Sequence, residues 1–102
     1  MSYHEPLEEL KPEDRDFSRA LNSLKEEIEA IDWYHQRSVT ATDSSLKDII
    51  EHNKNEEMEH AAMLLEWLRR NMPGWDNALK TYLFTKKEIT EIEEGGENNS
   101  SE

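Results

Sequence analysis

Residues 53–60 contain two side chains that could bind a metal ion. In the stretch Asn-Lys-Asn-Glu-Glu-Met-Glu-His, Glu57 and His60 are three positions apart. In a helix this spacing places both side chains on one face. Glu-x-x-His is also the spacing with which one helix offers a metal ion an oxygen ligand and a nitrogen ligand. We therefore consider this pair a candidate metal site.

The residues around this pair indicate that its face is buried. Steps of four and three residues connect mainly apolar positions, which is the period of a buried helical stripe: Leu46, Ile50, Asn53, Glu57, His60, Leu64 and Trp67. Burying an uncompensated carboxylate costs several kcal/mol. A bound cation would remove that cost, whereas a polar pair at a helix edge is the alternative interpretation.

A second carboxylate interrupts an earlier stripe, which consists of Ala20, Leu24, Glu27, Ile31 and Tyr34. Between the two stripes, residues 40–45 are rich in Thr, Ser and Asp, which is typical of a short turn. A turn this short predicts an antiparallel hairpin. With the turn centred near residue 42, Glu27 and Glu57 lie at equal height, about 22 Å from it at 1.5 Å per residue. The spacing thus brings three potential ligands together.

The predicted fold is all-α: an antiparallel two-helix hairpin followed by a short third helix. Pro12 and the acids after it are typical of a helix start, and Pro73-Gly74 is typical of a helix end. The helices are expected over residues 12–39, 44–71 and 75–84. The predicted organisation is an irregular N-terminal segment over 1–11, a hairpin domain with the third helix over 12–92, and a disordered acidic tail over 93–102.

One chain supplies half of the ligands that a di-metal site in a four-helix bundle uses. Four-helix di-metal carboxylate proteins use two helices that each give a Glu and two that each give Glu-x-x-His. This chain has one of each, and a lone hairpin cannot bury its own stripe. Two chains paired about a two-fold axis would remove both deficits and form a four-helix bundle with a two-metal site. Oxygen and imidazole ligands suit iron or manganese, and zinc can compete.

Composition excludes several other functions. The net charge of −12 argues against a nucleic-acid partner. There is no run of about 18 apolar residues to span a membrane. The absence of cysteine excludes disulfides and sulfur ligands. A cytoplasmic location is the default expectation.

Several segments together resemble the encapsulated ferritins over about residues 4–92. These segments are His-Glu-Pro-Leu at 4–7, residues 26–34, residues 52–61, residues 65–70 and Thr-Tyr-Leu-Phe-Thr at 81–85. The resemblance implies a ferroxidase that oxidises Fe(II) to Fe(III) with dioxygen at a di-iron centre between two subunits. It also implies a decameric ring and residence inside an encapsulin shell, the nanocompartment that stores the iron.

The same resemblance assigns roles to individual residues. Carried over by position, the family's centre falls on Glu27, Glu57 and His60. An outer uptake site falls on Glu26 and Glu29, with Trp33 nearby, and Tyr34 falls beside the centre. Other divalent metals such as Ca, Mn or Zn are expected to be able to occupy these sites.

One feature of the family is not found in this sequence. Encapsulated ferritins carry a C-terminal shell-targeting peptide with a Leu-Gly or Ile-Gly core, whereas this sequence ends Gly-Gly-Glu-Asn-Asn-Ser-Ser-Glu. We expect that the sequence stops before such a peptide. The alternative function is a non-catalytic helical assembly protein that uses divalent metal to hold its dimer together.

Overall fold

The structure, a computed structural model, describes residues 3–93. Its elements are a 3-10 turn η1 (Leu7–Glu9) and the helices α1 (Pro12–Thr40), α2 (Ser44–Asn71) and α3 (Trp75–Tyr82). No strand occurs among the described residues, and residues 89–93 are also helical. The chain forms two compact units, of which the first ends at Leu68 and the second begins at Arg69. The all-α prediction is confirmed. Of the predicted tail 93–102, all but Glu93 lies outside the described residues.

Local chemistry sets the start of α1. Pro12 occupies the first position, where its missing N–H costs nothing, and the Lys11 backbone N–H donates to Asp14 Oδ2 at 3.3 Å. Arg15 Nη2 donates to the Leu7 carbonyl at 2.6 Å, which ties η1 to the first turn of α1. The predicted irregular segment therefore contains a short ordered turn that its composition did not indicate.

The connection between the long helices is shorter than predicted. Helix α1 continues to Thr40, and α2 begins at Ser44, so that residues 41–43 form the linker. Asp43 caps α2, because its Oδ2 accepts a hydrogen bond from the Leu46 backbone N–H at 2.9 Å. Because the linker is so short, the second helix must run back antiparallel to the first.

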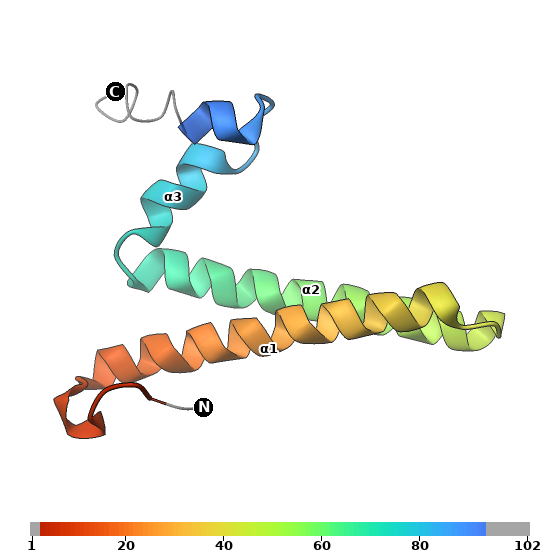
Figure 1. Cartoon of the computed structure of the whole chain (residues 1–102), viewed down its shortest axis with the longest axis horizontal. Helices are drawn as coiled ribbons and strands as arrows, with labels where there is room; N and C mark the ends of the chain where they lie inside the picture. Colours follow the sequence, from red (N-terminus) through yellow and green to blue (C-terminus); the bar gives the residue numbers. More distant parts are fainter. Residues whose placement is uncertain (1–2, 94–102) are drawn as a thin grey trace. The chain divides into compact units, whose positions relative to one another are not determined.

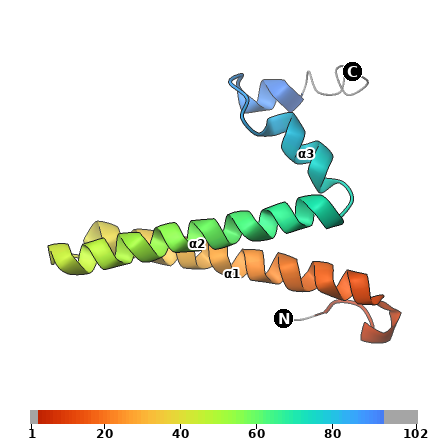
Figure 2. The ribbon, with the colours of Figure 1, turned by 180° about the vertical axis from the view of Figure 1, so that it is seen from behind.

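Within the first unit, α1 and α2 lie side by side as an antiparallel hairpin (Figures 1 and 2). Contacts between the helices follow one consistent register, in which residue numbers rise along α1 as they fall along α2. From the open end toward the linker, the contacting pairs are Phe17 with Trp67, Glu27 with His60, and His35 with Lys54. The first pair is an edge-to-face aromatic contact with ring centroids 6.1 Å apart.

The hairpin buries little apolar surface. Among the described residues, the buried apolar side chains are Ala20, Ile50 and Leu68, and the buried polar residue is Ser38. Large apolar side chains of the first unit that stay half-exposed or more include Ile28, Leu46, Ile49 and Met63. Two helices in contact can bury only the seam between them, so much of each apolar stripe remains open to water.

The second unit contains α3, which begins after a tight turn. Gly74 has φ +102°, a left-handed conformation that glycine adopts without strain. Asp76, in the first turn of α3, pairs with Lys80 at 3.0 Å and with Arg69 at 2.5 Å, and these two cations lower the pKa of Asp76. Helix α3 ends at Tyr82, two residues earlier than predicted. None of the helices in the described part of the chain is long and apolar enough to cross a membrane.

Leu68 provides a test of how much the thin core contributes to stability. Its side chain is fully buried, with 0% exposure. We predict that Leu68→Ala lowers the free energy of unfolding by about 2–5 kcal/mol, because it removes buried apolar contacts and leaves a cavity. Urea denaturation followed by circular dichroism measures the change. The control is Val39→Ala at an exposed position, which should cost less than about 0.5 kcal/mol. Equal losses in both variants would contradict this description of the core.

Candidate metal centre

Three potential ligands meet in the seam between α1 and α2. His60 Nδ1 lies 3.7 Å from Glu27 Oε2 and 3.7 Å from Glu57 Oε1. The candidate ligand atoms of these three residues all lie within 4.8 Å of one another, and among the described residues they form one such group. We call Glu27, Glu57 and His60 the triad. The predicted height match between Glu27 on α1 and Glu57 on α2 is present in the structure.

The triad is partly open to solvent on one side. The Glu27 and Glu57 side chains are 23% and 22% exposed, whereas the His60 ring is 42% exposed. Glu27 Oε2 is buried and has no hydrogen-bond partner. An orphaned carboxylate oxygen is unfavourable in a protein interior unless a cation satisfies it. This oxygen, with Glu57 and His60 beside it, fits a divalent metal ion.

The electrostatics of the triad favour a bound proton or metal. The neighbouring Glu57 carboxyl, which can share a proton with Glu27, is the main reason that the pKa of Glu27 is raised. Burial and charge repulsion from Glu57 raise it further, and His60 partly opposes the shift. The two carboxyl groups therefore resist being ionised together when no cation is present.

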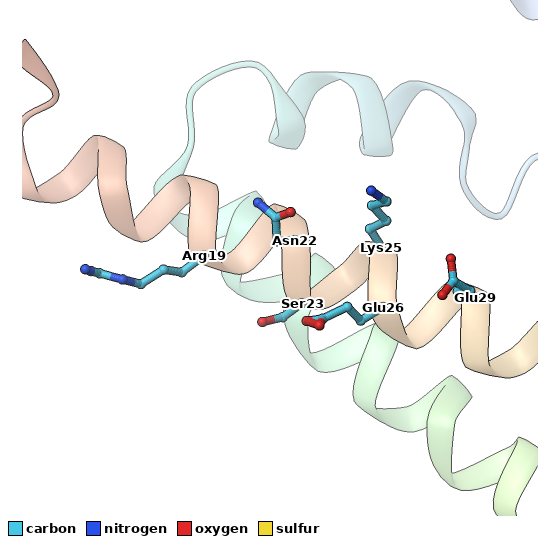
Figure 3. Close-up of a pocket in the computed structure, with 6 residues that line it drawn as sticks. All are labelled: Arg19, Asn22, Ser23, Lys25, Glu26 and Glu29. Carbon is cyan, nitrogen blue, oxygen red and sulfur yellow. The ribbon is translucent and has the colours of Figure 1, made fainter. Parts of the chain in front are cut away.

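The two acids of the predicted outer uptake site lie elsewhere on α1. Glu26 and Glu29 are exposed and line a shallow hollow that Arg19, Asn22, Ser23 and Lys25 also line (Figure 3). All of these residues belong to one helix, so α2 adds no ligand to the hollow. Because two cationic side chains share it with the two acids, the uptake role of Glu26 and Glu29 stays a prediction.

The aromatic residues predicted near the centre have other contacts. The guanidinium carbon of Arg37 lies over the Tyr34 ring, 5.6 Å from its centroid. Trp33 is 50% exposed and lines a shallow hollow together with Gln36 and Arg37. The roles predicted for Trp33 and Tyr34 beside a metal stay predictions.

Sequence reasoning missed a second group of polar residues in the same seam, closer to the linker. Ser38 is buried, and Lys54 contacts both Glu51 and His35. A signal was available, because Ser38 continues the stripe of Glu27, Ile31 and Tyr34 at helical spacing. A serine, unlike a carboxylate, is too common on such stripes to draw attention.

Comparison with known proteins agrees with the all-α fold. A protein-family model described as EncFtn-like matches residues 2–86. A ferritin-like protein of Thermotoga maritima is 71% identical over 101 residues, covering 96% of this chain and 89% of that protein. An encapsulated ferritin-like protein of Rhodospirillum rubrum is 56% identical over 92 residues, covering 90% of this chain and 66% of that protein. A crystal structure of a Nitrosomonas europaea protein has a TM-score of 0.83 and 55% identity, covering 87% of this chain and 98% of that one.

The raised pKa of Glu27 predicts a pH dependence of stability in metal-free protein. The folded chain binds this proton more tightly than the unfolded chain, whose pKa is near 4.5. Stability from Glu27 is therefore fully present below pH 4.5 and is lost as the pH rises through the folded value. Glu27→Gln removes this ionisation while keeping the shape of the side chain. As the pH rises above 4.5, we expect the free energy of unfolding of Glu27→Gln to increase relative to that of the wild type.

Urea denaturation of chelator-treated protein at a series of pH values measures this difference. Glu26→Gln, an exposed neighbour on the same helix, is the matched control. Wild-type and Glu27→Gln curves that run parallel over the whole range would contradict the assigned interaction between Glu27 and Glu57.

Proposed function

The chain belongs to the EncFtn-like family of encapsulated ferritin-like proteins, and on that premise we propose that it is a ferroxidase that oxidises Fe(II) to Fe(III) with dioxygen. The convergence of Glu27, Glu57 and His60 is the observation that carries this proposal. Two carboxylates and an imidazole are ligands that suit ferrous iron, which is the substrate of the reaction. The orphaned oxygen of Glu27 supports the same conclusion.

The complete centre in this proposal forms between two copies of the chain. One triad offers too few ligands for two metal ions, and a single hairpin leaves large apolar residues such as Ile28 and Met63 exposed. A two-fold axis beside the triad would bring together two copies of Glu27, Glu57 and His60 in a four-helix bundle. The proposed minimal active unit is therefore a homodimer, and dimers are proposed to form a decameric ring.

The proposed reaction uses the charge and hardness of these ligands. The carboxylates of two Glu27 and two Glu57 residues match the charge of two Fe(II) ions, so that metal binding relieves their repulsion. Two adjacent ferrous ions can each give up one electron to the same dioxygen molecule, which a single ion does less readily. The neutral His60 ring completes the ligand set without adding negative charge.

Uptake and storage belong to the same proposal. Glu26 and Glu29 would attract Fe(II) on the outer face of α1, and the acidic surface would raise its local concentration. The Rhodospirillum rubrum relative is named as an encapsulated protein. We propose that this chain likewise works inside an encapsulin shell in the cytoplasm, where ferric iron is stored.

A second candidate function is a metal-linked assembly protein without catalysis. The exposed apolar residues of the hairpin favour it, because a dimer interface could cover them without any catalysis. Aerobic stopped-flow absorbance after addition of Fe(II) separates the two functions. A ferroxidase forms ferric iron well ahead of the buffer control, whereas an assembly protein binds iron and leaves its oxidation rate unchanged.

The triad residues should all be required for rapid oxidation. We predict that Glu27→Ala, Glu57→Ala and His60→Ala each lower the initial rate of ferric formation on the order of tenfold or more, since loss even of groups that support ligands costs 10–100-fold. Circular dichroism should confirm intact helices. Glu59→Ala is the control, because it removes an exposed carboxylate of α2 that belongs neither to the triad nor to the proposed uptake site. Wild-type rates in all three triad variants would exclude this centre.

Metal should also drive assembly if the centre is shared between chains. A metal that binds the dimer and not the lone hairpin shifts the equilibrium by about 2.7 kcal/mol at a hundredfold excess over Kd. We expect Fe(II) under argon, or Mn(II), to convert small species of chelator-treated protein into larger ones, as measured by native mass spectrometry. His60→Ala should respond less. If the distribution of oligomeric species does not change with metal at any protein concentration, apolar packing alone holds the interface.

A further inference from the structure

A second polar group lies in the hairpin seam, between the triad and the linker. Lys54 Nζ on α2 lies 2.8 Å from Glu51 Oε2 and 3.5 Å from His35 Nδ1 on α1. Ser38 Oγ donates to the His35 carbonyl at 3.0 Å. Lys54 first, and then the nearby Ser38, lowers the pKa of Glu51. We call His35, Ser38, Glu51 and Lys54 the polar cluster.

Two members of the polar cluster are largely buried, and for Lys54 this is unusual. Ser38 is only 2% exposed, and the Lys54 side chain is only 14% exposed. Long cationic side chains are seldom buried this far unless they are paired. Glu51, the acidic partner of Lys54, is 39% exposed, and a partly exposed ion pair contributes little to stability. Stability alone therefore does not explain the polar cluster.

The position of the polar cluster relates it to the triad. Glu51, Lys54 and Glu57 follow one another at three-residue steps along one side of α2. Ser38 lies about three helical turns after Glu27, and so on nearly the same side of α1. The contact between Lys54 and His35 joins α1 to α2 next to the faces that carry the triad. Any rotation or sliding that separated Lys54 from His35 would also move Glu57 and His60 relative to Glu27.

We propose that Lys54 is a positioning residue, whose contacts to Glu51 and His35 fix the rotation and height of α2 against α1 so that the triad converges on a metal ion. The inference rests on the proposed metal-binding role of the triad. The three-residue linker limits sliding of α2 but does not by itself fix its rotation. Ligand groups need tight placement, since a displacement of about 1 Å can cost as much as a hundredfold in function.

Lys54→Met tests the proposal, because it keeps the apolar stem and removes the ammonium group. Glu51, which is 39% exposed, can then be solvated and is not left as a buried unpaired charge. We expect the Kd of the full-length protein for Mn(II), measured from the electron paramagnetic resonance signal of free Mn(II), to rise on the order of tenfold. The urea midpoint of the metal-free variant should stay at or above the wild-type value. Lys54→Arg should restore Mn(II) affinity to within about twofold.

The direction in which the Kd for Mn(II) changes separates a positioning role of Lys54 from a simple effect of its charge. Removing a positive charge near acidic ligands should by itself strengthen cation binding. The matched control, Lys47→Met, removes an exposed lysine of the same helix and should leave the Kd unchanged or slightly lower. Mn(II) binding by Lys54→Met that is as tight as wild type, or tighter, would overturn the positioning role while leaving the ferroxidase proposal intact.

Two other outcomes are also decisive. Weaker binding that comes with a matching fall in the urea midpoint, or with failure to fold, would make Lys54 a purely structural residue and overturn the proposal. If the His60→Ala variant binds Mn(II) as tightly as the wild type does, the metal-binding role of the triad itself is overturned. The two failures are distinguishable because the first leaves the His60→Ala effect in place.

Discussion

The close approach of Glu27 and Glu57 across the α1–α2 seam is the constraint that the rest of the hairpin has to accommodate. Each carboxyl belongs to a different helix, and the raised pKa of Glu27 registers their closeness. Packing of the seam on either side must hold them together against their mutual repulsion. The neighbouring His60 relieves only part of it, because its Nδ1 lies 3.7 Å from each carboxylate, which is too far for good hydrogen bonds. A cation placed among the three groups would relieve much more.

The contacts that hold the seam lie on both sides of the triad. Toward the open end, Phe17 and Trp67 meet edge to face, and toward the linker Lys54 reaches across to His35. The aromatic pair contributes apolar contact area, whereas Lys54 adds a polar contact to His35 at 3.5 Å. The seam therefore has an apolar contact near its open end and a polar contact toward the linker.

The thin interior of the hairpin has a consequence for the proposed function. Because so few apolar side chains are buried in one chain, a protein of this size gains little stability alone. Association through the exposed stripe would supply both the missing burial and the missing ligands. Stability and activity would then depend on the same interface, so a metal-free protein is expected to be less stable and less assembled than a loaded one.

The sequence by itself determined the long helices, the reversal between them and the polar interruptions at Glu27, Glu57 and His60. These follow from helical periodicity and local turn chemistry, which depend on residues close together in the chain. Equal distance from the linker was enough to place Glu27 opposite Glu57, because helical rise is constant. Local rules also missed details at the ends, where α1 continued to Thr40 and Arg15 held the 3-10 turn.

Only the tertiary structure decided which side chains touch across the seam. Three features depend on how far each helix is rotated about its axis. They are the approach of His60 to both carboxylates, the Glu27 oxygen without a hydrogen-bond partner, and the contact of Lys54 with His35. A rotation of a few tens of degrees would leave every helix and every stripe intact while separating these atoms. Periodicity specifies a face of a helix and not an ångström-scale position, so the geometry of the site had to come from packing.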